Sequence, residues 1–169
     1  IMADPVPPVS LPGREYLELF NRTTLPVDIR KWSLLVDDQN YIMPSFTIEP
    51  QSYLILCAAT DTTTFSKFGR AVGMKSFPVL SDNGRTLVLS DSLGNMIHGV
   101  AYSPQWYGSN LKSDGGWSLE MIDTDFPFFA EGNWEASTAS AGGSPGRVNS
   151  SGRSNPDNYF YGLDNVFPV

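Results

Sequence analysis

Short runs in which apolar and polar residues alternate recur along the chain, and turn-forming residues separate them. Alternation with a period of two places the apolar side chains on one face of an extended strand. The sequence therefore predicts strands within EYLELF (15–20), WSLLVD (32–37), YIMPSFTI (41–48), SYLILCAA (52–59), TLVLSD (86–91), MIHGVAY (96–102) and WSLEMID (117–123).

Turn signals bound these runs. The chain has 15 glycines and 13 prolines, and pairs such as Glu49-Pro50 and Asn83-Gly84 follow predicted strands. Residues 86–102 read as a β-hairpin whose turn lies at Leu93-Gly94-Asn95. The segment TTTFSKFGR (62–70) predicts one short helix, because Phe65 and Phe68 are spaced for one helical face.

Many short strands with frequent turns predict an all-β fold with one short helix, arranged as a β-sandwich or a small barrel. A chain of 169 residues fits one domain with a tail. After Ser137 the composition shifts to Ala, Gly, Ser, Asn and Pro, and the final stretch regains aromatic residues. We expect a domain over 1–150, with 151–169 a tail on the domain or a linker to a following domain.

Charge narrows the classes of partner. The net charge is −7, and the basic residues are scattered, which disfavours nucleic acid and anionic membrane surfaces as partners. No stretch approaches the roughly 18 to 20 apolar residues of a membrane span. The single cysteine, Cys57, lies in an apolar run and is expected to be buried. Because the chain begins at Ile1, we interpret it as an excised domain or processed product, with any export signal outside it.

Catalytic motifs are weak. GGSPG (142–146) matches the pattern of a nucleophile elbow, but the residue after Ser144 is Pro145, which has no N–H to donate to an oxyanion hole. We interpret the motif as a tight turn. His98 is the only histidine and lies in a predicted strand, with Met96 on its face and Ile97 on the other. A partly buried or surface role for His98 is favoured over a catalytic one.

Two carboxylates lie close together in EYLELF. On a strand, Tyr16, Glu18 and Phe20 share one face, while Glu15, Leu17 and Leu19 share the other. Glu15 and Glu18 therefore point to opposite sides and cannot form an acid/base pair. Between two aromatic side chains, Glu18 is expected to need a partner such as a basic side chain or a backbone N–H.

Metal chemistry is limited to calcium. No spacing of cysteine or histidine suits a transition metal. Conceivable calcium ligands are Asp4, Asp37, Asp38, Asp123 and Asp125, although none follows an EF-hand loop and all are compatible with solvated loop positions. No cofactor and no metal are predicted.

Aromatic residues supply the one candidate binding site. Trp106 and Tyr107 lie in SPQWYGSN (103–110), which reads as a loop, where adjacent aromatics can stack on a sugar or dock a partner. The alternative is that Trp106 folds back over the end of the sandwich. Trp32, Trp117 and Trp134 lie in or beside strand-like runs and are expected to pack against the core.

The ordered series of motifs resembles the lamin-tail domain in its bacterial form. The matching pieces run from residue 1 to about 150 and are IMADP (1–5), EYLELFNRTTLPVDIRKWSL (15–34), TIEPQSYLIL (47–56), FSKFG (65–69), LSDNGRTLVLSDSLGNMIHGVAY (80–102), GGWSLEMID (115–123), NWEAS (133–137) and GGSPGRVNS (142–150). Each piece is weak alone, but eight in order are fairly specific. The last 19 residues fall outside the pattern.

The resemblance implies an immunoglobulin-like β-sandwich and a non-catalytic interaction module. It further implies an accessory domain of a secreted or cell-surface bacterial protein, beside neighbouring domains and with a protein or glycan partner. A carbohydrate-binding or calcium-stabilised adhesion domain is the alternative. A glycosidase and a nucleic-acid-binding role are the less favoured hypotheses, the second because of the negative charge.

Overall fold

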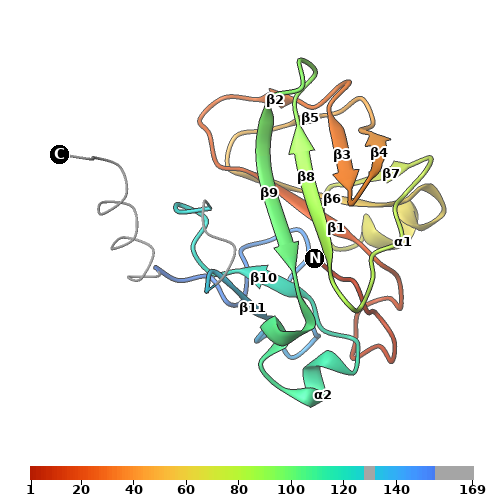
Figure 1. Ribbon diagram of the computed structural model, residues 1–169, viewed down its shortest axis with the longest axis vertical. Helices are drawn as coiled ribbons and strands as arrows, with labels where there is room; N and C mark the ends of the chain where they lie inside the picture. The colour runs from red at the N-terminus through yellow and green to blue at the C-terminus, as the bar shows by residue number, and fades with distance from the viewer. Residues whose placement is uncertain (128–131, 155–169) are drawn as a thin grey trace.

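The computed structural model describes residues 1–127 and 132–154, and it shows a β-sandwich built from two main sheets (Figure 1). The first sheet has the order β1-β6-β7, formed by Leu17–Asn21, Ser52–Ala58 and Ala71–Met74. The second has the order β4-β3-β8-β9, formed by Gln39–Ile42, Ser33–Val36, Arg85–Ser90 and Met96–Tyr102. Two small ladders pair β2 (Val27–Asp28) with β5 (Thr47–Ile48), and β10 (Leu119–Met121) with β11 (Trp134–Ala136).

Helical structure is short. The predicted helix is present as α1 (Thr62–Phe65), preceded by the 3₁₀ turn η1 (Ala59–Asp61). A second turn of α-helix, α2 (Asn110–Ser113), follows the 3₁₀ turn η2 (Pro104–Tyr107) and was not predicted. It forms because the Ser109 side chain caps it by accepting a hydrogen bond from the Lys112 N–H.

The all-β sandwich that the sequence predicts is confirmed, and each of the seven predicted runs contains at least one strand. The run 41–48 differs in detail, because it divides into β4 and β5 on either side of Pro44. The strands β2, β7 and β11 were not predicted. They are two to four residues long, and they lie outside the alternating runs from which strands were predicted.

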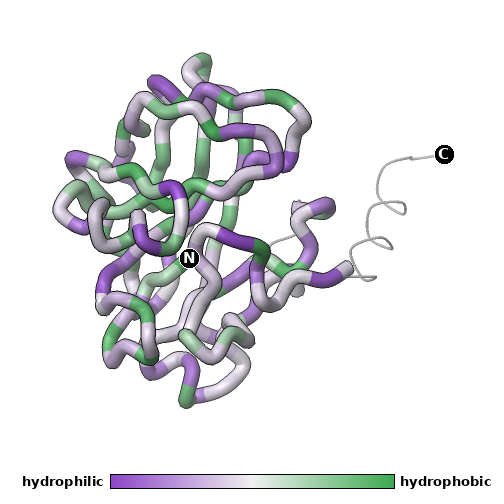
Figure 2. Tube along the Cα trace, turned by 180° about the vertical axis from the view of Figure 1, so that it is seen from behind, coloured by the Kyte–Doolittle hydropathy of each residue, from purple (hydrophilic) through white to green (hydrophobic). Residues whose placement is uncertain are grey.

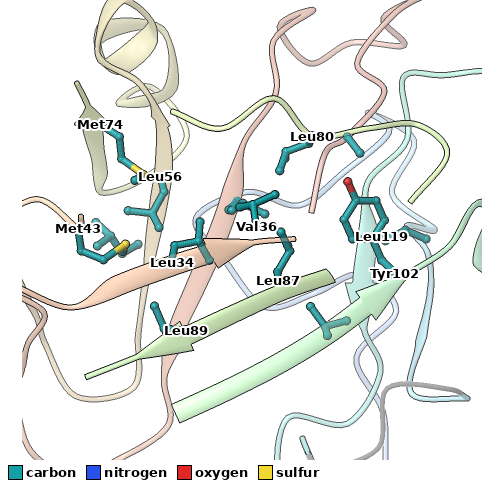
Figure 3. Packing of buried hydrophobic residues seen from close by; sticks show 14 of the residues in the cluster. Leu34, Val36, Met43, Leu56, Met74, Leu80, Leu87, Leu89, Tyr102 and Leu119 are labelled. Atoms are coloured by element: carbon teal, nitrogen blue, oxygen red, sulfur yellow. The ribbon is translucent and has the colours of Figure 1, made fainter. Parts of the chain in front are cut away.

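The main core lies between the two sheets. Leu34, Val36 and Leu87 gather with Leu56 and Met74 in this space (Figure 3). Apolar stretches of the chain concentrate along the strands, and hydrophilic stretches lie mostly in the connections (Figure 2). Burial of these side chains supplies the main driving force for folding.

A second, smaller core covers the outer face of the first sheet. It contains Met2, Leu11, Tyr16, Ile55, Cys57 and Phe65. Side chains alternate along β6, so Leu54 and Leu56 join the main core while Ile55 and Cys57 join the second. Cys57 is fully buried, as its apolar context predicts.

A buried carboxylate fixes the segment after β11 to the sandwich. Glu120 on β10 accepts hydrogen bonds from the Ser144 N–H (2.9 Å) and hydroxyl (2.7 Å), and from the Ser150 hydroxyl (2.7 Å) and the Ser151 N–H (3.2 Å). Burial alone would raise the pKa of Glu120, but the hydroxyl groups of Ser150 and Ser144 hold it below the usual value. We call this arrangement the Glu120 clamp.

The predicted domain boundary at residue 150 does not coincide with a break in packing. Ser151 is buried and bonded to Glu120, and Arg153 forms a two-pronged ion pair with Glu135 at 2.6 and 3.1 Å. Most of the predicted tail, residues 155–169, lies outside the described residues, so its role as tail or linker stays a prediction.

The Glu120 clamp leads to a stability prediction. Glu120→Ala leaves the buried N–H groups of Ser144 and Ser151 without acceptors, so we expect the free energy of unfolding to fall by about 3 kcal/mol or more. The matched control is Glu135→Ala, which breaks an exposed ion pair and should cost about 1 kcal/mol or less. Urea unfolding measures both, and similar losses in the two variants would contradict the clamp.

Candidate functional site

An apolar cleft of about 500 Å³ lies between the two sheets. Its lining includes residues of β1 and of β9. These are the edge strands of their sheets in the described part of the chain (Figure 1). Its walls are mostly aliphatic and aromatic, from Leu17, Leu19, Leu34, Leu87, Leu89, Val100, Trp32 and Trp134. We call this hollow the edge cleft.

A β-bulge determines which side chains of β9 enter the edge cleft. The pairing with β8 shifts between Leu89 and Ser90, so that His98 lies opposite Leu89 while Met96 lies opposite Ser90. Ile97 is the extra residue at this irregularity. Beyond it the strand is regular, with Val100 and Tyr102 buried and Gly99 and Ala101 exposed. His98 therefore shares the inward face with Val100.

His98 is the unusual polar group in the edge cleft. Its Nε2 atom is buried and has no hydrogen-bond partner among the described residues. Burial lowers the pKa of His98, which favours the neutral ring at pH 7. A neutral imidazole nitrogen can donate or accept one hydrogen bond, so a ligand hydroxyl could satisfy it in either role. A catalytic role would require a hydrogen-bonded nucleophile, and no such contact is present among these residues.

Glu18 also lines the edge cleft, and the expected partner is present. Its carboxylate accepts a hydrogen bond from the Gly146 N–H. Burial raises the pKa of Glu18 to about 7, the Gly146 N–H and the positive amino group of Ile1 oppose this rise, and the nearby charge of Glu120 adds to it. Beside it, the ring of Phe20 stacks on Tyr53 with centroids 4.5 Å apart.

Glu18 and Glu120 both border the edge cleft, and their pKa values are shifted in opposite directions. Such a contrast is also a mark of acid/base pairs in enzymes. In this protein, both oxygens of Glu120 are already bonded to serine groups and the side chain is buried. The contrast therefore follows from the different donors of the two carboxylates, and it supports a structural role.

The GGSPG motif forms a loop that donates hydrogen bonds to both Glu18 and Glu120. Ser144 binds Glu120 through its N–H and hydroxyl, and Gly146 binds Glu18 through its N–H. Gly142 and Gly146 have φ values of +90° and +78°, a region that side-chain-bearing residues rarely adopt. The tight-turn interpretation agrees with this geometry, since the Ser144 hydroxyl donates to a carboxylate and not to a histidine.

The predicted binding pair lies against the core. Trp106 is half-buried and stacks on Trp134 with centroids 6.3 Å apart. Tyr107 is buried with 6% of its surface exposed. Both residues form the turn η2, and this position matches the alternative in which Trp106 folds back over the sandwich. Their role in binding stays a prediction. Trp32, Trp117 and Trp134 pack against the main core as expected.

The candidate calcium ligands are dispersed. Asp37 pairs with Arg85 at 2.6 Å, Asp4 accepts from the Val6 N–H, and Asp123 accepts from the Asp125 N–H. Within residues 1–127 and 132–154, no group of three or more His, Cys, Asp or Glu side chains is arranged to hold a metal ion.

Within the same ranges, no helix is long and apolar enough to cross a membrane.

Sequence reasoning missed the edge cleft and the Glu120 clamp. Uninterrupted alternation over 96–102 places Met96, His98, Val100 and Tyr102 on one face, whereas the bulge leaves Met96 exposed and keeps His98 on the buried face of Val100 and Tyr102. The one available signal for Glu120 was its place between Leu119 and Met121 in a strand, followed by a serine-rich segment at 137–151. Nothing in that pattern specifies which serines bind it.

The raised pKa of Glu18 predicts a pH-dependent stability. Its folded pKa of about 7 lies above the ordinary value of 4.5, so the stability present below pH 4.5 is lost as pH rises through 7. Glu18→Gln removes this loss. Its gain in unfolding free energy over the unmodified chain should grow from near zero at pH 4.5 to as much as about 3 kcal/mol at pH 8.

Thermal melts from pH 4.5 to pH 8 measure this difference. The control is Glu49→Gln at an exposed position, which should follow the unmodified chain at every pH. Melting temperatures of Glu18→Gln and the unmodified chain that stay parallel across the range would contradict the assignment.

Comparison with known protein families matches residues 1–104 to the Lamin Tail Domain family. No curated protein matches the sequence. The matched range contains both main sheets, with Glu18 and His98, whereas β10, β11 and the Glu120 clamp follow it. The two facing sheets agree with the sandwich that the resemblance implies. The match spans more than half of the 169 residues, and the chain belongs to the lamin tail domain family.

Proposed function

We propose that the domain is a non-catalytic interaction module that binds a protein partner along β9 and the tip of the β8–β9 hairpin. The observation that carries this proposal is a group of exposed apolar side chains at that tip. Leu93, Met96 and Ile97 are 86%, 70% and 50% exposed. Scattered exposed apolar residues are ordinary, but three within five positions of one hairpin form a contiguous candidate surface.

The backbone of β9 supports the same surface. In the described part of the chain, β9 pairs with β8 on one side and has no strand on the other. Natural edge strands are usually protected by charged residues or proline, and MIHGVAY contains neither. An extended segment of a partner can add to such an edge through main-chain hydrogen bonds, with neighbouring side chains supplying specificity.

The family membership supports a binding role over a catalytic one. We further propose that the domain is an accessory part of a secreted or cell-surface bacterial protein, for which the support is the resemblance described above. Labelling of intact and lysed source cells with an antibody against the domain tests this location. Signal from intact cells is expected, and signal from lysed cells alone would contradict the proposed location.

The binding surface is tested by capture of partners from an extract of the source cells on immobilised domain. A Leu93→Ser/Met96→Ser/Ile97→Ser variant should retain at least about tenfold less of a specifically captured protein, because apolar burial of about 1.5–3 kcal/mol per side chain is lost. Leu111→Ser is the matched control, since Leu111 is 76% exposed on α2, away from this hairpin.

The same assay tests the predicted aromatic site. If the partner binds the hairpin and not Trp106, Trp106→Ala should lower the melting temperature and leave capture by the folded protein unchanged. If the partner is still captured by the hairpin variant but is no longer captured by Trp106→Ala, the proposed binding at the hairpin is contradicted and binding at η2 is favoured. Equal loss with Leu111→Ser would show that the retained protein binds nonspecifically.

A further inference from the structure

We propose that the edge cleft is a binding site for a neutral, single-chain amphiphile, meaning an alkyl or isoprenoid chain that ends in a hydroxyl group. Nothing in the proposed protein-binding role requires this site. Leu93 and Met96 do not line the edge cleft, and Ile97 is the only residue that it shares with the hairpin surface.

The size and the walls of the edge cleft favour a small molecule. Its volume of about 500 Å³ falls within the roughly 300–1,000 Å³ that is usual for small-molecule sites. Leu17 and Leu19 of the first sheet face Leu87, Leu89 and Val100 of the second across it. These side chains can gain contacts with an alkyl chain on both sides without any change in the strand pairing.

The position of His98 assigns the head group. Its Nε2 atom is buried at the wall and has no hydrogen-bond partner within residues 1–127 and 132–154, and an unpaired buried polar atom is costly. A hydroxyl group both donates and accepts, so it can pair with either neutral form of the imidazole ring. A pure hydrocarbon would leave this atom unsatisfied.

Charge disfavours an anionic head group. Glu18 and Glu120 both border the edge cleft, and an anion buried near two carboxyl groups is opposed by desolvation and by repulsion. Two basic groups also reach the lining: the Arg22 guanidinium, which is exposed to solvent, and the amino group of Ile1, whose pKa is lowered by burial and which donates to the Leu119 carbonyl. The interior of the edge cleft therefore matches an alcohol better than the corresponding carboxylate.

Titration of the full chain with 1-decanol, followed by calorimetry and by the fluorescence of Trp32 and Trp134 at the cleft wall, tests the site. We expect saturable binding with one site per chain, and binding of decanoate about tenfold weaker at pH 8. His98→Phe keeps a ring in place but removes Nε2, and it should weaken decanol binding about tenfold.

Two further variants test the location, each in a chain shown to be folded by circular dichroism. Val100→Trp should abolish binding because the larger side chain fills the edge cleft. Leu19→Phe should weaken binding, and its half-buried position accommodates a larger side chain more easily. Met96→Ala, outside the lining, is the control and should bind as the unmodified chain does. Unchanged binding in the folded cleft variants, or unsaturable binding, would overturn the proposal.

Other occupants give different results. Decanoate binding tighter than decanol and lost in Arg22→Ala would overturn the neutral class. A synthetic peptide of residues 159–169 that displaces decanol would assign the edge cleft to a segment of this chain. A dimer in sedimentation that decanol converts to monomer would assign it to a second copy. The result of the capture assay with the hairpin variant tests only the proposed protein-binding function, and it does not test decanol binding in the edge cleft.

Discussion

The hydrogen bonds of the buried Glu120 carboxylate are the interactions on which the packing of β10, β11 and the segment after β11 depends. A charged group inside a protein must be paired or fully hydrogen-bonded, and Glu120 meets this requirement with Ser144, Ser150 and Ser151. These contacts bring the segment after β11 back across β10. They also hold Gly146 where its N–H reaches Glu18 on β1. One desolvated acid thereby connects a strand outside the family-matched range to the first sheet inside it.

The edge cleft follows from how the two sheets end. Where β1 and β9 terminate their sheets, the described chain provides no further strand to bring the facing walls together. Leu19 is consequently only half-buried, although its alternation with Leu17 marks it as a core residue. His98 faces the same space, because it lies on the buried face of β9 with Val100 and Tyr102. The apolar hollow thus results from sheet geometry, and the His98 nitrogen in it has no partner among the described residues, which is the basis of the proposed ligand site.

The two proposals use different physical properties of one strand. The outer edge of β9 offers unpaired main-chain groups and exposed apolar side chains, which suit an extended protein segment. The inner face offers a concave apolar wall and a polar atom, which suit a small amphiphile. Ile97 belongs to both sites, so substitutions that leave Ile97 in place can change one site without altering the other.

The sequence by itself determined the positions of the seven predicted runs, the β8–β9 hairpin, the opposite faces of Glu15 and Glu18, and the burial of Cys57. All of these follow from local alternation and turn chemistry, which act over a few residues. Only the tertiary structure decided that Tyr107 is buried, that Met96 lies exposed before the bulge, and that Ser144 binds Glu120. Those outcomes depend on a bulge, on sheet edges and on contacts between residues far apart in sequence. Local periodicity does not specify which residue, distant in the sequence, a side chain contacts.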